Sequence, residues 1–151
     1  MALPQTLSWG IKESLLNYIE SLDDGLVSHS ETVSRDAENF TFPLNPALSN
    51  FDESEFQGLL QFDGEVTFTG YFGAMNIRVR NPQLQIKGGQ GILSVVVESV
   101  FSGERYDPIA VIKQIETEPS RKFVTVLTAE GQMLFGPQYQ PGQELSPLLL
   151  D

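Results

Sequence analysis

The chain has 151 residues, which suits a single domain around one core, and 40% of them are hydrophobic, which excludes a disordered chain. Its 20 acidic and 9 basic residues give a formal charge of −11, and so acidic a surface disfavours nucleic acids and anionic lipids as partners. The lack of cysteine excludes disulfides, thiolate catalysis and cysteine-based metal sites.

The N-terminal region predicts a helix and shows no targeting segment. The opening MALPQTLSWG lacks the basic and apolar regions of a signal peptide, and no run approaches the ~18 apolar residues of a membrane span. Residues 9–22 are expected to form an amphipathic helix capped by Ser8, and we expect Tyr18 to point inward from its apolar stripe. The stripe consists of Ile11, Leu15, Tyr18, Ile19 and Leu22.

From residue 26 onward the pattern changes to period two, interrupted by Gly, Pro and Asn, which is typical of antiparallel sheets. The candidate strands are 26–33, 39–43, 56–69, 74–81, 83–87, 91–101, 108–115 and 122–128, and residues 43–54 form the longest predicted loop. A short helix capped by Thr128 is expected near 128–135, before a proline-rich extended tail. The sequence therefore predicts a mainly β protein, an antiparallel β-sandwich with one helix near each end.

The stretch FTGYFGAMN, residues 68–76, forms an unusual hairpin tip. Two aromatic residues, Tyr71 and Phe72, stand between two glycines, where a hairpin usually carries Asn, Asp or Ser. On the returning strand, alternation places Arg78 and Arg80 on the side away from the core. Such a tip is either packed under a neighbouring loop or available to a ligand.

Residues at enzyme-like spacing are few. The single histidine, His29, has no carboxylate or serine at a catalytic spacing, and no nucleotide-binding or zinc-protease motif is present. Asp52, Glu53 and Glu55 could hold a calcium ion or form a solvated acidic loop, and KGGQG at 87–91 is typical of a hairpin turn. The residues therefore favour a protein that is not an enzyme.

Three tyrosines occupy places that favour no single role: Tyr18 on the helix, Tyr71 at the hairpin tip and Tyr139 in the tail. Each could pack its ring and expose its hydroxyl to water, as tyrosines commonly do. Each could also provide a phenolate oxygen, and tyrosine is a known axial ligand of haem. Composition and spacing leave both alternatives open.

In their order along the chain, several segments resemble the haem-transport-associated (HtaA) domain of Gram-positive surface haem-uptake proteins. The resemblance rests on the first helix, the hairpin and the C-terminal third. The matching segments are LSWGIKESLLNYI (7–19), FTFPL (40–44), GEVTFTGYFGAMNIRVRNPQLQI (64–86), VTVLTAEGQMLFG (124–136) and YQPGQELSPL (139–148). The resemblance implies a single HtaA-like domain over residues 1–151.

The resemblance also implies a ligand set. By position, Tyr18 resembles the family's axial tyrosine and would be the iron ligand, and Tyr139 matches a second tyrosine in the C-terminal motif. The family usually has a histidine at the hairpin tip, where this chain has Tyr71, and a phenol is a much poorer proton acceptor than an imidazole at neutral pH. Phe72 could cover a porphyrin face, and Arg78, with Arg80, could pair with propionates.

The function that follows from the resemblance is the capture and transfer of haem for iron acquisition, without catalysis. The partners would be haem and other haem-uptake proteins, a haem-bridged homodimer is a further expectation, and the location would be the cell surface or the extracellular medium. The alternative is a protein–protein interaction or adhesion domain that has kept the fold and lost haem.

Overall fold

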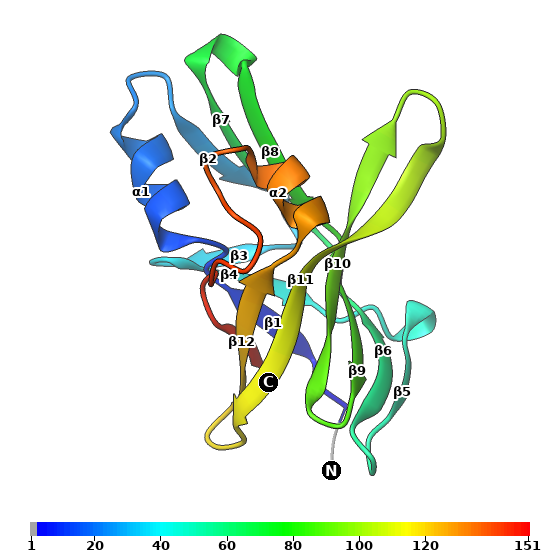
Figure 1. Ribbon diagram of the computed structural model, residues 1–151. Coiled ribbons are helices and arrows are strands. Elements are labelled where there is room, and N and C mark those ends of the chain that lie inside the picture. Colours follow the sequence, from blue (N-terminus) through cyan, green and yellow to red (C-terminus); the bar gives the residue numbers. More distant parts are fainter. Residues whose placement is uncertain (1–2) are drawn as a thin grey trace.

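Two antiparallel sheets carry most of the chain in the computed structural model, which describes residues 3–151 (Figure 1). The larger sheet is built from ten strands of this described part. Across it the strands lie in the order β3 (Ser34–Asp36), β4 (Asn39–Pro43), β1 (Thr6–Trp9), β13 (Leu148–Leu150), β12 (Arg121–Leu127), β11 (Gly103–Glu116), β10 (Gln90–Ser99), β9 (Gln83–Lys87), β6 (Gln57–Gln61) and β5 (Asn50–Asp52).

The smaller sheet contains β2 (Leu26–His29), β7 (Glu65–Gly70) and β8 (Met75–Arg80), in that order. Helix α1 (Glu13–Ser21) packs against β2 and β7, and α2 (Ala129–Phe135) packs against β11. Two 3₁₀ turns complete the fold, η1 (Pro46–Leu48) and η2 (Tyr71–Gly73), and η2 forms the tip of the β7–β8 hairpin. The predicted mainly β, antiparallel fold with a helix near each end is confirmed.

Alternation along the strands builds the core. In β7 and β8, Val66, Phe68, Ile77 and Val79 are buried while their neighbours face outward, as period two requires. The ring of Phe68 meets Phe40 of β4 edge to face, with centroids 6.4 Å apart, so the small sheet shares its core with the large one.

The two ends of the chain are joined through β13, which lies between β1 and β12. The buried indole of Trp9 donates a hydrogen bond to the Ser146 carbonyl oxygen at 2.7 Å, and the Thr125 hydroxyl donates to the same oxygen. The backbone N–H of Gln5 donates to the Asp151 carbonyl at 2.6 Å. The C-terminal tail is thus an integral part of the large sheet.

The expected N-terminal helix is wrong in its start. Residues 6–9 form a strand, and the helix begins only at Glu13, with Lys12 at the N-cap and no side-chain cap. Ile11 adopts a left-handed backbone (φ 66°), which a helix cannot accommodate. Leu16 is buried, and Tyr18 is exposed to 42%, so the inward orientation expected for Tyr18 is also wrong.

Other element boundaries differ from those expected. The strand expected over 56–69 is two strands separated at 62–64, because Gly64 takes a positive φ of 124° and turns the chain from the large sheet into the small one. The strand expected over 26–33 ends at His29, and the predicted loop 43–54 contains η1 and β5. The short helix and its Thr128 cap are confirmed, since the Thr128 hydroxyl accepts the Gly131 N–H at 3.0 Å.

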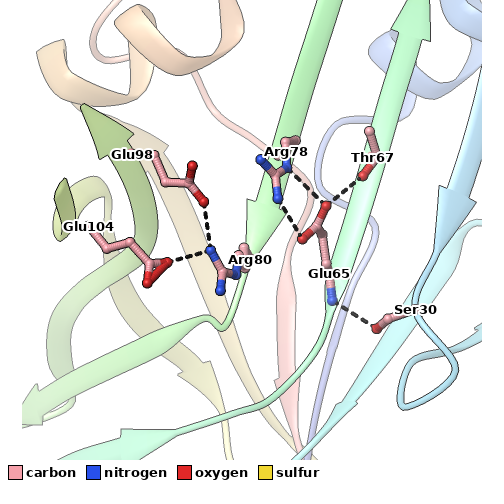
Figure 2. A network of polar contacts seen from close by, with 7 residues as sticks. All are labelled: Ser30, Glu65, Thr67, Arg78, Arg80, Glu98 and Glu104. Carbon is pink, nitrogen blue, oxygen red and sulfur yellow. Dashed lines mark hydrogen bonds and ion pairs between the residues drawn. The ribbon is translucent and has the colours of Figure 1, made fainter. Parts of the chain in front are cut away.

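The long β10–β11 hairpin extends beyond the sheet and is tied to β8 by charge (Figures 1 and 2). The guanidinium of Arg80 pairs with Glu98 of β10 at 3.0 Å and with Glu104 of β11. On the same strand Arg78 pairs with Glu65 of β7 at 2.9 Å and lowers the pKa of that carboxyl. The outward orientation predicted for both arginines is confirmed.

Neither α1 nor α2 is long enough to cross a membrane, and no other helix in residues 3–151 could do so. The acidic segment considered for calcium is a turn in which Asp52 accepts the backbone N–H groups of Ser54 and Glu55. Within the described residues, no group of three His, Asp or Glu side chains is arranged to hold a metal ion.

Candidate functional site: a tyrosine cluster

The tip of the β7–β8 hairpin is held against the end of α1. Asp24, in the loop that follows the helix, accepts the backbone N–H of Tyr71 at 3.2 Å and that of Phe72 at 2.6 Å, one with each carboxylate oxygen. Both tip residues have a left-handed backbone, with φ of 50° for Tyr71 and 56° for Phe72. That conformation is unfavourable for residues with a Cβ, so the carboxylate offsets part of the strain.

A glycine permits the close approach of the hairpin to the helix. A Cβ on Gly70 would lie 2.8 Å from Cδ1 of Leu22, which is closer than two carbon atoms can pack. Gly25 lets the loop that carries Asp24 turn back against the end of α1, because a Cβ there would lie 1.7 Å from the carbonyl oxygen of Ile19. The two glycines and Asp24 therefore bring the tip to α1.

At this junction the phenol oxygens of Tyr18 and Tyr71 share a short hydrogen bond. The bond to Tyr71 raises the pKa of Tyr18, with smaller contributions from desolvation and from the neighbouring Tyr139. Tyr18 is exposed to 42% and Tyr71 to 50%, so a ligand from solvent can reach both oxygens.

The third tyrosine lies beneath this pair. Tyr139 is buried, its ring meets Phe135 edge to face at 6.0 Å between centroids, and its backbone carbonyl accepts the side-chain amide of Gln132. Burial raises the pKa of the Tyr139 phenol, and a hydrogen bond with the Ser14 side chain of α1 partly offsets that effect. We call Tyr18, Tyr71 and Tyr139 the tyrosine cluster.

Of the residues that the resemblance implies for haem, the structure brings together Tyr18, Tyr71, Phe72 and Tyr139 and leaves Arg78 and Arg80 apart. Phe72 adjoins the cluster and is exposed to 99%, so its ring is free to meet a ligand or a partner. Arg78 projects from the opposite face of the hairpin, because its neighbour Ile77 is on the core side, where Gly70 meets α1. Its Nε and Nη2 groups already donate to Glu65, which leaves Nη1 for a propionate (Figure 2).

Sequence reasoning missed Asp24 and Ser14 as parts of this site. Asp24 lies just beyond the helix predicted over residues 9–22, and the residues that donate to it lie 47 and 48 positions further along the chain. No local pattern reveals a carboxylate that accepts hydrogen bonds from so distant a turn. The flanking glycines marked the tip as unusual, and the structure gives Tyr71 and Phe72 a left-handed backbone.

A family model matches almost the whole chain. The HtaA family model, described as Htaa, matches residues 4–151. The chain belongs to the HtaA family. No curated protein matches it in sequence.

Solved HtaA structures share the fold. The C-terminal domain of HtaA from Corynebacterium glutamicum superposes with a TM-score of 0.81 at 22% identity, covering 97% of this chain and 95% of that one. The N-terminal domain of the same protein gives 0.77 at 21% identity, covering 99% of this chain and 98% of that one. The haem-binding protein HtaB of this organism gives 0.71 at 21% identity, covering 97% and 91%.

Proposed function

We propose that this HtaA-family chain binds haem at the tyrosine cluster and passes it on without chemical turnover, with Tyr18 as the iron ligand. The observation that carries the proposal is the accessible pair of phenol oxygens of Tyr18 and Tyr71, held together by the Asp24-anchored tip. Haem is the cargo of such a domain, which fits the scarcity of catalytic groups.

The donor chemistry of the cluster fits this cargo. A phenolate is a hard anionic oxygen, and tyrosine is an established axial ligand of haem iron. Phe72, which follows Tyr71 in the chain, offers an exposed ring, and the buried Tyr139 lies near Tyr18. Tyr18 must lose its proton to act as a ligand, and its raised pKa makes that loss less favourable.

Tyr71 can assist Tyr18 only as a donor. In the free protein the bond between the two phenols raises the pKa of Tyr18, whereas a Tyr18 phenolate bound to iron would accept a charge-assisted hydrogen bond from the Tyr71 hydroxyl. An imidazole at position 71 could instead accept the proton. We therefore expect haem binding by this chain to release a proton to solvent and to strengthen as the pH rises towards the pKa of Tyr18.

A titration with ferric haem, followed by its Soret absorbance, tests the proposal. The parent should bind one haem, and Tyr18→Phe should remove the iron–phenolate spectrum while preserving the fold. Tyr71→His should strengthen binding and reduce its pH dependence. Tyr106→Phe is the matched control, because it removes a phenol that is bonded to Gln61, away from the cluster. If Tyr18→Phe binds as the parent does while Tyr71→Phe does not, the ligand is Tyr71.

One observation favours a second function, a protein–protein interaction or adhesion domain that has lost haem. An almost fully exposed phenylalanine at a rigid tip is the kind of aromatic anchor that interfaces use. The absence of any Soret shift with the parent, together with a partner whose binding is lost in Phe72→Ala, would favour this function over haem binding.

The partners and the compartment are part of the same proposal. We expect action in iron acquisition outside the cytoplasm, at the cell surface, with other haem-uptake proteins donating or accepting haem. An exposed haem face would also permit a haem-bridged homodimer, which sedimentation with and without haem would reveal. Fractionation of native cells that recovers the protein only from the cytoplasm would contradict the expected location.

A further inference from the structure

The outer face of the large sheet carries an open groove of about 670 Å³ across β9, β10, β11 and β12, away from the tyrosine cluster. Its side chains point away from the core, because Leu93 and Leu127 on the same strands are buried on the other face. The residues that define this outer groove are Ile92, Val111, Val124, Val126, Lys87 and Lys113.

Strand register arranges these side chains in two rows. Ile92 pairs with Val111, and Val111 pairs with Val126, so three β-branched side chains form an apolar row across adjacent strands. In the next row along the strands, Gln90 lies between Lys87 and Lys113, so the lysines are two strands apart. Neighbouring strands are about 4.8 Å apart, and residues i and i+2 on a strand are about 7 Å apart. The groove is therefore an apolar row beside a basic row.

Both rows lack partners within the described residues. Ile92 is exposed to 42% and Val111 to 47%, although the solvent face of an antiparallel sheet is normally polar. Within residues 3–151 no carboxylate lines the groove, and neither Lys87 nor Lys113 forms an ion pair. Two free ammonium groups on a chain with a net charge of −11 make this a local positive site on an acidic molecule.

We propose that the outer groove binds a long-chain carboxylate, with its alkyl chain on the apolar row and its head group between the lysines. Burial of an alkyl chain against Ile92 and Val111 supplies the apolar contribution, and the ammonium groups select a negative head. No aromatic ring and no Tyr, His or Met lines this part of the described chain, which disfavours haem.

Binding of sodium laurate, kept below its micelle concentration, to ¹⁵N-labelled protein tests the proposal by amide chemical shifts. We expect saturable one-to-one binding with shifts on β10, β11 and β12. The double variant Lys87→Gln/Lys113→Gln should weaken binding about tenfold, and Val111→Asp should remove it. Lys122→Gln, on the same face but outside the groove, is the matched control and should bind as the parent does.

The same measurement can overturn the proposal in several ways. Dodecyltrimethylammonium, which has the same chain and the opposite charge, should bind at least about tenfold more weakly, and equal binding would show that the lysines select nothing. Shifts that do not saturate, or shifts centred on the tyrosine cluster, would exclude the groove as the binding site for laurate. The same conclusion would follow if protoporphyrin displaced laurate more strongly than a second fatty acid does. A sheet-to-sheet dimer in the ligand-free protein would assign the groove to a second copy instead. Tyr18→Phe should leave laurate binding unchanged. The groove proposal and the haem proposal can therefore be refuted separately.

Discussion

Replacement of Asp24 by alanine should release the hairpin tip from α1 without unfolding the protein. The side chain is exposed and accepts two backbone N–H groups, those of Tyr71 and Phe72, at 3.2 and 2.6 Å. Both residues are held with a left-handed backbone, which costs about 1–2 kcal/mol per residue. In Asp24→Ala water can satisfy the two N–H groups, but nothing replaces the carboxylate that holds the tip against this strain.

The size of the effect follows from those two bonds. A hydrogen bond to an exposed carboxylate contributes about 0.5–1 kcal/mol after competition with water, so the pair contributes about 1–2 kcal/mol to the closed tip. That free energy changes the ratio of closed to open tips about 5- to 30-fold. If the cluster binds haem only with the tip closed, the apparent affinity should fall in proportion to the lost closed population.

Two measurements check this prediction, one with haem and one without it. Soret titration should show haem affinity reduced by up to about 30-fold, with the thermal midpoint little changed. In the free protein, ultraviolet pH titration should show the pKa of Tyr18 moving down towards its ordinary value, because the hydrogen bond with Tyr71 is the main cause of its rise. Asp23→Ala, which removes the same charge from the adjacent residue, should do neither. Parent-like behaviour of Asp24→Ala in both measurements, or an equal loss in Asp23→Ala, would refute the reasoning.

Three further predictions concern stability and can be checked by chemical denaturation. Gly25→Ala should lower the free energy of unfolding by about 1–3 kcal/mol, because its Cβ would overlap the backbone carbonyl of Ile19, 1.7 Å away, and no flexible side chain can yield. Trp9→Phe should cost about 2 kcal/mol through a smaller ring and the lost bond to Ser146, and an unchanged midpoint would contradict the anchoring of the tail. Burial raises the pKa of Tyr139 in the folded state above its unfolded value of about 10. The resulting stability is fully present below the unfolded pKa and is lost as pH rises through the folded pKa. Tyr139→Phe should therefore reduce the fall in the free energy of unfolding at alkaline pH.

Much of the fold could be predicted because its pattern is local. Alternation in β7 and β8 identified both the core residues and the outward arginines, since a strand's two faces follow directly from period two. The second helix was found from its cap, because the Thr128 hydroxyl bonds within the first turn. These features depend on neighbours within a few residues.

The errors occur where distant segments decide the outcome. Ser8 is a good cap by type, yet residues 6–9 pair with β4 and β13, and strand pairing at both edges prevails over helix propensity. Tyr18 was expected inside because its spacing matches the stripe, whereas burial of Leu16 turns the helix and leaves Tyr18 at the edge of the packed face. The three leucines of β13 follow a proline-rich segment and gave no strand prediction. They form a strand only because they lie between β1 and β12.

The three tyrosines of the candidate site stood out in the sequence, but their arrangement did not. The tyrosines were singled out by their unusual places, and the structure brings Tyr18 and Tyr71 into contact. Their exposure and the part played by Asp24 depend on loop geometry that no spacing in the sequence encodes. Arg78 shows the opposite case, since its outward direction was right and its ion-pair partner was unforeseen.

The hydrogen bonds that join the two ends of the chain also set how the domain can be attached to anything else. Because Thr6 and Asp151 bond to each other in both directions, a linker enters and leaves at one point. That point lies at the far end of the molecule from the β7–β8 tip (Figure 1). Whether attached through one end or linked to neighbours at both ends, the domain would present the tyrosine cluster on the side away from its point of attachment. A short glycine linker could also join the two ends, which would allow a circular permutant with new termini in the β10–β11 hairpin.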